Sequence, residues 1–327
     1  MKILLSLILV LFSVSSSPYA SANCGSSSCP IDHHSYMISG VFRIGVSYEN
    51  IKMDKLMFGT NRVSVGQLPV DHDELETINE RAMLNAEYGV SSRLSFNVMA
   101  PYIVREHSHI HHGDNGDELE HWNFSGIGDV MVHGTYVLQQ SMSPDVPYIA
   151  LTTGIKLPTG ATNKSNEHAE EAEVTIQPGT GSYDGVLSLN GRYVVGTVKS
   201  LNGSYTVLPF TSNITVRMNG KGKDDYRIGN EIVGSVGTMI ELDQRLRLLL
   251  QLNARSVGRS DVGTTGEERS NTGGTWVFLT PGIGSELFSN MNFFVYAQIP
   301  LYQNVHGIQQ VAGLNVQAGI SYNANLF

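Results

Sequence analysis

The residues with the clearest potential for chemistry are histidines gathered in one stretch of the chain. Segment 106–112 reads E-H-S-H-I-H-H, and several carboxylates follow it. Imidazole and carboxylate groups together form the usual ligand set for zinc, copper or nickel. On an extended strand, the H-x-H alternation brings the first three imidazoles to one side. The candidate metal ligands are His107, His109, His111, His112 and His121.

Two other interpretations of this His-rich segment stay open. It could be a solvated surface loop with no fixed site, or a loop whose weak capture of metal gates or feeds a pore. Histidine tracts bind transition metals readily whether or not binding is their role.

A second set of reactive residues lies near the N-terminus. The only two cysteines, Cys24 and Cys29, occur in the sequence C-G-S-S-S-C, with Asp32, His33 and His34 shortly after. In an oxidising compartment this pair would form a small disulfide loop. The alternative is a metal or redox site. The two exclude each other at any moment because only thiolates bind metal.

Strands must position any such site, because apolar and polar residues alternate with a period of two along the whole chain. In segment 182–193, Leu187 and Leu189 share one parity, whereas Asn190 and Arg192 share the other. A soluble sandwich could contain one such strand. The recurrence of the pattern between short turns and long polar loops is typical of a transmembrane β-barrel.

The fold prediction is an all-β, transmembrane antiparallel barrel of about twelve strands, an even number as in bacterial single-chain barrels. The predicted strands are 40–49, 79–88, 93–104, 126–139, 148–157, 182–193, 204–217, 227–242, 245–255, 275–287, 292–301 and 313–322. Short and long connections alternate, so short turns would face the periplasm and long loops the outside. Lipid satisfies no backbone polar group, and the strands must therefore close on themselves.

The polar parity of these strands carries charges of both signs. The predicted lumen selectivity residues are Arg43, Arg81, Asp129, Lys156, Arg192, Glu231, Arg245, Arg247 and Arg255. Rings of charge tune which solutes pass through a pore. The alternative is a set of ion pairs that fills a narrow barrel, since small barrels are packed with side chains. We expect a narrow or partly plugged pore, with the N-terminal segment either as the plug or as a free periplasmic tail.

The first residues of the chain have the features of a secretion signal. Lys2 precedes an apolar core, and Ala20-Ser21-Ala22 fits a small-x-small cleavage site. The predicted organisation is a signal peptide at 1–22, a periplasmic segment with the cysteine pair at 23–39, and an outer-membrane barrel at 40–327. Cleavage near Ala22 places the protein beyond the inner membrane of a Gram-negative cell.

Composition and the chain end constrain the partners. The formal net charge of −9 disfavours a nucleic-acid partner. No apolar run after the signal is long enough to predict a membrane-spanning helix. The expected partners are outer-membrane lipid, a small-molecule solute and the barrel-assembly machinery, which reads a terminal aromatic residue such as Phe327.

Three motifs follow one another in order: S-G-I-G-D at 125–129, L-P-T-G at 157–160 and P-G-T-G-S-Y-D at 178–184. Together they resemble the outer-membrane family named for the meta-pathway of phenol degradation, over most of the mature chain. The resemblance implies a barrel transporter for hydrophobic aromatic compounds. The cysteine pair and the histidine cluster are not part of that family's pattern. Read from the residues alone, these glycines permit unusual backbone geometry, and Asp129 and Asp184 either cap turns or touch a solute.

The predicted function is an outer-membrane channel for small solutes, hydrophobic or metal-linked. It requires no cofactor, and the His-rich segment is a candidate site for zinc, copper or nickel. One alternative is a metal-binding surface or accessory barrel without transport activity. A hydrolase could pair His133 with Ser125 or Asp129. No G-x-S-x-G motif occurs, and His133 falls in mid-strand rather than at a rim, so we expect no enzyme.

Overall fold

The structure is a computed structural model that describes residues 39–67, 72–113, 116–140, 143, 146–243, 245–265, 269–288 and 290–325. The predicted signal peptide, the pair Cys24 and Cys29, and the terminal Phe327 lie outside the described residues.

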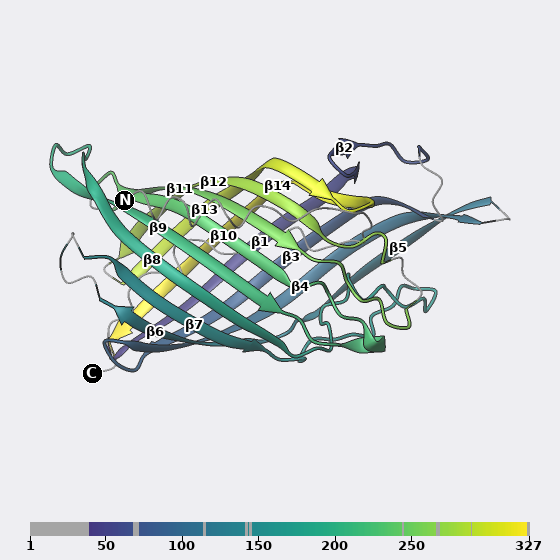
Figure 1. Cartoon of the computed structure of the whole chain (residues 1–327), viewed down its shortest axis with the longest axis horizontal. Helices are drawn as coiled ribbons and strands as arrows, with labels where there is room; N and C mark the ends of the chain where they lie inside the picture. The colour runs from purple at the N-terminus through teal and green to yellow at the C-terminus, as the bar shows by residue number, and fades with distance from the viewer. Residues whose placement is uncertain are drawn as a thin grey trace, which may run out of the picture.

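Twelve long antiparallel strands close into one barrel (Figure 1). They are β1 (Val41–Phe58), β3 (His72–Gly89), β4 (Leu94–Gly113), β6 (Met131–Gln139), β7 (Tyr148–Lys156), β8 (Asp184–Lys199), β9 (Tyr205–Met218), β10 (Glu231–Glu241), β11 (Leu246–Val257), β12 (Gly274–Phe288), β13 (Met291–Val305) and β14 (Ile308–Asn325). Two further strands, β2 (Asn61–Arg62) and β5 (Gly116–Ile127), pair only with β1 and β4 respectively. Pairing of β14 with β1 closes the ring, so the predicted fold class is confirmed.

Alternation along each strand explains the closure. Leu187 and Leu189 are 45% and 47% exposed on the outer face of β8, while Ser188 and Asn190 between them are buried inside. In β11, Leu250 and Leu252 point outward in the same way, and Gln251 and Asn253 are each only 1% exposed. An apolar outer surface with a polar interior is the pattern of a barrel that lipid surrounds.

The first three barrel strands are longer than predicted. β1 continues to Phe58, β3 begins at His72 and β4 continues to Gly113. The extensions of β3 and β4 are rich in polar residues on both faces, and the extension of β1 has Lys52 and Asp54 on its outer face. The apolar outer face that marks a lipid-facing strand is therefore absent there. The predicted loop after β4 is wrong as well, because that segment returns as β5 and pairs with β4 from Gly113↔Gly116 to Tyr102↔Ile127. Figure 1 shows this hairpin extending beyond one end of the barrel.

The connection between β13 and β14 breaks the predicted alternation of short and long loops. These strands lie in the same antiparallel sheet, and only His306 and Gly307 lie between them, at the end of the barrel that carries the long connections. Gly307 has φ +61°, a conformation that glycine adopts without strain. The strand ends on either side of this turn contain the polar pairs Gln303-Asn304 and Gln309-Gln310, which interrupt the apolar alternation used to predict the strands.

Longer connections at the same end pack against the rest of the chain instead of standing free. Segment 157–183 places Ile176 at 3% exposure, and segment 219–230 places Tyr226 at 2%. Segment 258–273 contributes Thr272, which is fully buried. Among the described residues, no helix is long and apolar enough to cross a membrane.

Candidate functional site

One part of the lumen wall is aromatic, which the mixed-charge prediction did not include. Trp276 and Phe278 of β12 and Phe294 and Tyr296 of β13 are all buried. The Phe294 and Tyr296 rings stack with centroids 4.7 Å apart. A Cβ on Gly282 would stand 2.3 Å from the Tyr296 ring, so the bare backbone there makes room for the aromatic group. By contrast, the inward faces of β8 and β9 carry hydroxyl and amide groups.

A cavity of about 360 Å³ opens toward the end of the barrel that carries the short turns. Its lining combines the guanidinium groups of Arg43 and Arg247 with the ring of Phe294 and the thioether of Met239. Arg43 donates to Asn323 Oδ1 at 2.9 Å. The cavity therefore offers cationic, amide and apolar groups to one small molecule, together with the carboxyl group of Glu286.

Most of the predicted selectivity charges are engaged in ion pairs. Arg43 lies 3.3 Å from Glu87, Arg81 pairs with Glu49, and Arg255 lies 2.8 Å from Glu231. Arg192 is half-buried in β8, and Arg247 donates to Asn292 at 2.8 Å. Arg245 differs, because it stands exposed in the turn before β11 and not in the strand. These distances favour the ion-pair interpretation for much of the set.

The remaining two predicted lumen residues, Lys156 and Asp129, belong to a buried polar cluster with Thr180, Ser182 and Asp184, here called the Lys156 centre. Lys156 Nζ lies 2.7 Å from Asp129 Oδ2 and 3.0 Å from Asp184 Oδ2. It also donates to Ser182 Oγ at 3.2 Å and to Thr180 Oγ1. All three charged side chains are at most 7% exposed.

The two carboxylates of the Lys156 centre are saturated with donors. Asp129 accepts backbone N–H groups from Gly160 at 3.0 Å and from Thr180 at 2.9 Å. Asp184 Oδ1 accepts from Ser182 Oγ at 2.8 Å and from the Gly220 N–H at 3.1 Å. Asp129 lies in the break between β5 and β6. Burial there would raise its pKa, but Lys156 and the two N–H donors hold the pKa below its usual range.

The three sequence motifs thus converge on one place. The first supplies Asp129, the second follows Lys156, and the third supplies Thr180, Ser182 and Asp184. Gly160 and Gly179 pack backbone to backbone, since a Cβ on either would stand 2.6 Å or less from the other's atoms. Of the two roles predicted for Asp129 and Asp184, capping a turn or touching a solute, their contacts match the first. Asp129 fixes both ends of segment 157–183 through the N–H groups of Gly160 and Thr180.

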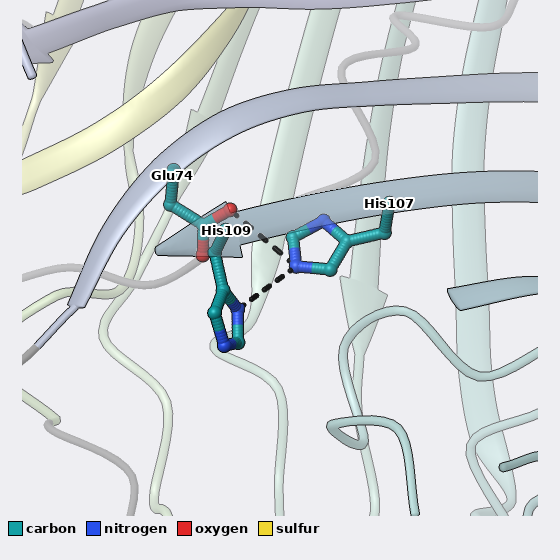
Figure 2. Close-up of side chains that lie close together, drawn as sticks. All are labelled: Glu74, His107 and His109. Atoms are coloured by element: carbon teal, nitrogen blue, oxygen red, sulfur yellow. Dashed lines mark hydrogen bonds and ion pairs between the residues drawn. The ribbon is translucent and has the colours of Figure 1, made fainter. Parts of the chain in front are cut away.

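A second polar cluster, here called the His107 centre, lies where β3 and β4 extend past the predicted ranges (Figure 2). His107 Nε2 is 3.3 Å from His109 Nδ1 and 3.6 Å from Glu74 Oε2. One ligand atom from each of the three residues lies within 4.8 Å of the others. Side-chain exposure is 0% for His107, 9% for His109 and 11% for Glu74. Two imidazoles and a carboxylate therefore lie close together in a largely buried site.

A β-bulge brings Glu74 to this centre. Thr77 faces His107 across the β3–β4 ladder, so simple alternation would put position 75 inward and Glu74 outward. The register shifts between Glu74 and Glu76, and as a result Glu74 faces His109. A bulge re-aims a side chain in this manner. Glu76 points the other way and pairs with Lys52 at 2.6 Å.

Thr77 of β3 and residues from two other strands, β5 and β14, surround the His107 centre. Thr77 Oγ1 lies 2.8 Å from His107 Nδ1 and donates to Gln310 Oε1 of β14 at 2.5 Å. Glu120 Oε2 of β5 lies 2.9 Å from His109 Nε2. The Trp122 ring contacts both imidazoles, with centroid distances of 5.7 Å to His107 and 5.0 Å to His109.

Segment 157–183 contacts Trp122, whose ring packs against both imidazoles of this centre. Trp122 Nε1 donates to the Glu170 carbonyl oxygen at 3.1 Å, and the indole packs in one cluster with Phe124, Ala172 and Ile176. Segment 157–183 is thus tied to the Lys156 centre at its ends and touches the His107 centre through its middle.

The other predicted metal ligands lie apart from this cluster. His111 and His121 are exposed on the hairpin, and the side chain of His112 lies outside the described residues. No pattern in the sequence indicated Glu74, Thr77, Gln310 or Trp122 as neighbours of the two histidines. Knowledge of the bulge and of the β4–β5 hairpin would have been needed to find them. The hydrolase alternative paired His133 with Ser125 or Asp129. In the structure, Ser125 Oγ forms a hydrogen bond with Tyr102 Oη at 2.9 Å, and Asp129 belongs to the Lys156 centre.

No family model and no curated protein matches the chain. Among solved structures, an outer membrane channel from Pseudomonas putida F1 matches with a TM-score of 0.59 and 14% identity, over 91% of this chain and all of the other. A Pseudomonas aeruginosa FadL homologue matches at TM-score 0.40 and 8% identity, over 88% of this chain and 90% of the other. The Pseudomonas putida toluene transporter TodX gives 0.39 and 10%, over 88% and 89%. The first match establishes the fold of an outer-membrane channel barrel, and the other two are too distant to add to it.

Proposed function

We propose that the protein is an outer-membrane channel for small solutes. The observation that carries this proposal is a cavity of about 360 Å³, lined by Arg43, Arg247 and Phe294, inside a closed barrel with an apolar outer face. Small-molecule sites combine apolar walls with a few placed polar groups in this way. The barrel shares its fold with a protein described as an outer membrane channel.

The solute class that we propose is hydrophobic aromatic compounds, including those with a polar or anionic substituent. The aromatic wall formed by Trp276, Phe278, Phe294 and Tyr296 supports this class, because aromatic rings stack on one another favourably. The guanidinium of Arg247 supports an anionic substituent, since it stands beside Phe294 in the same cavity. The three sequence motifs support the same class through the resemblance that they carry.

The proposed location is the outer membrane of a Gram-negative bacterium, reached after removal of the signal peptide and with the help of the barrel-assembly machinery. The apolar side chains exposed around the barrel support a lipid partner, because exposed apolar surface of this extent is rare on soluble monomers.

A second candidate function is metal capture by an accessory barrel that does not conduct. The His107 centre favours this candidate, because it lies at the end of the barrel with the long connections and gathers metal-ligating groups.

Planar-bilayer recording separates the two candidates. The refolded mature chain is added to a lipid bilayer, and current is recorded with and without an aromatic carboxylate such as benzoate. Discrete conductance steps that benzoate partly blocks are the expected result, with loss of the block in Arg247→Leu. Protein that is folded by heat-modified gel mobility yet gives no steps, and no benzoate uptake into liposomes, would overturn the channel in favour of the accessory barrel.

A further inference from the structure

We infer that Glu74, His107 and His109 form a binding site for a divalent metal ion of the zinc class in the wall of the lumen. The site differs from the sequence expectation, which drew on five histidines and on no residue of β3. It is independent of conduction, because a barrel that passes no solute could still hold the ion.

The first argument is the hydrogen bonding of His107. Thr77 Oγ1 gives its proton to Gln310 Oε1, so toward His107 the same oxygen acts as acceptor. In this arrangement the neutral His107 ring carries its proton on Nδ1. Its Nε2 then presents a lone pair to the centre of the cluster.

The second argument is the hydrogen bonding of His109. Glu120 Oε2 accepts at 2.9 Å from His109 Nε2, and an ionised carboxylate only accepts. His109 Nδ1 is thus the unprotonated nitrogen, and it faces His107 Nε2 across 3.3 Å. Two lone pairs that converge at this distance repel each other unless a cation lies between them.

The outer partners match those of known metal sites. A metal-ligating histidine usually gives its other N–H to a carboxylate or another oxygen, which fixes the tautomer and the ring orientation. Here Thr77 serves His107 and Glu120 serves His109. The third group, the Glu74 carboxylate, supplies negative charge beside the two neutral rings.

The spacing indicates the kind of metal. For metal–nitrogen bonds of about 2.0–2.1 Å, a separation of 3.3 Å corresponds to an N–metal–N angle of about 105–110°. This angle is close to tetrahedral, the geometry of zinc, whereas copper(II) prefers tetragonal sites. Glu74 Oε2 lies 3.6 Å from His107 Nε2, a separation that two ligands of one zinc ion can have.

Three protein ligands leave one position open, as in sites where a metal keeps a water or exchanges. The Glu120 side chain is 23% exposed, so the ion can enter beside it. We therefore expect reversible binding rather than a permanently buried ion.

Trp122 provides a direct readout. The chain has two tryptophans, and the second, Trp276, lies under Arg255 with 5.3 Å between guanidinium carbon and ring centroid. In a Trp276→Phe background, fluorescence reports Trp122 alone. The full mature barrel, purified without a histidine tag, is titrated with Co²⁺, and Zn²⁺ is then added as a non-quenching competitor.

The expected result is saturable quenching by Co²⁺ at one ion per chain, with visible absorption bands typical of tetrahedral Co²⁺, and its reversal by Zn²⁺. Glu74→Gln should weaken binding at least tenfold, and His107→Gln and His109→Gln should abolish it. Glu120→Gln, which removes only the outer partner, should weaken binding about 10- to 100-fold.

Matched controls come from the same strands. Glu76 lies on the other side of the bulge, so Glu76→Gln removes a carboxylate that faces away from the site. His111→Gln and His121→Gln remove exposed imidazoles. All three should bind Co²⁺ as the parent does. The Glu74 and Glu120 variants keep the test decisive if the buried His107 variant fails to fold.

Two outcomes would overturn the site. One is an absence of quenching and of absorption bands in folded protein, which would mean that a proton occupies the space between the imidazoles. The other is binding that survives Glu74→Gln and Glu120→Gln unchanged but falls with His111→Gln or His121→Gln, which would place the metal on the exposed hairpin.

Discussion

The Lys156 centre and the His107 centre lie inside the same barrel, and both gather buried polar groups from several strands. At the Lys156 centre one ammonium meets two carboxylates, and hydroxyl and N–H donors cover the rest of the carboxylate oxygens. At the His107 centre two imidazoles and a carboxylate converge, and the groups around them turn both nitrogen lone pairs inward.

This difference separates a structural centre from a binding centre. A buried charge without its partner is costly, so a cluster whose donors and acceptors match is complete without a ligand. A cluster of converging lone pairs needs a cation from solution. The two centres also differ in what they hold, since the Lys156 centre fixes both ends of segment 157–183 and the His107 centre only touches its middle.

The largest expected effect is that of Lys156→Met. The substitution leaves Asp129 and Asp184 buried without their shared cation, and it should destabilise the barrel by about 3–5 kcal/mol. Freed at its ends, segment 157–183 should become accessible to protease, and channel conductance should rise. Urea unfolding in detergent micelles and limited proteolysis measure the two effects.

A surface lysine is the control for this change. Lys221 is 57% exposed and pairs with Asp225 at 3.6 Å, so Lys221→Met should cost about 1 kcal/mol or less. Equal unfolding midpoints for the two variants would show that the Lys156 centre is not the anchor described above.

The second prediction tests the assumption that both centres face a lumen. Leu252 lies in the middle of β11 on the outer face, and Leu252→Arg should cost about 2–4 kcal/mol in a bilayer. Leu248, near the strand's beginning, lies closer to the membrane interface, so Leu248→Arg should cost about 0–1 kcal/mol. Folding yield into liposomes measures both, and a reversed order would mean that the barrel sits at another depth.

The third prediction separates the centres by their response to metal. Zinc at about 100 times its dissociation constant should raise the free energy of unfolding by about 2.7 kcal/mol, because only the folded chain assembles the site. EDTA should remove the effect. In Glu74→Gln the same zinc concentration should add much less. An equal gain in that variant would assign the stabilisation to metal bound elsewhere.

The sequence revealed the Lys156 centre better than the His107 centre, and the reason lies in geometry. Asp129 and Asp184 belong to the first and third glycine motifs, and Lys156 directly precedes the second, so local sequence marked all three residues. Glu74 reaches the His107 centre only because a bulge reverses its parity, which alternation cannot reveal. Gln310 arrives from β14 through barrel closure, more than two hundred residues from Thr77.

The fold itself was more accessible, with one consistent error. Twelve strands were found because lipid enforces an apolar outer face, as Leu187 and Leu189 show. Where β3 and β4 pass beyond that apolar belt, polar residues occupy both faces, and the sequence pattern there predicts a loop and not a strand. The His107 centre lies in these extensions, so the residues nearest to its chemistry were the ones with the weakest strand signal.

The smallest expected effect on stability comes from the cavity, which belongs to neither centre. Arg247→Leu removes a cation that lines the cavity and donates to Asn292, and it should cost about 1 kcal/mol. Its effect on permeation should be larger, because loss of a positive charge from a narrow pore favours cations. Arg245 is the matched control, since it lies two residues away in an exposed turn. In a salt gradient, Arg247→Leu should shift the reversal potential toward cation selectivity and Arg245→Leu should leave it in place. Equal shifts would mean that ions respond to charge at the barrel mouth and do not pass through the cavity.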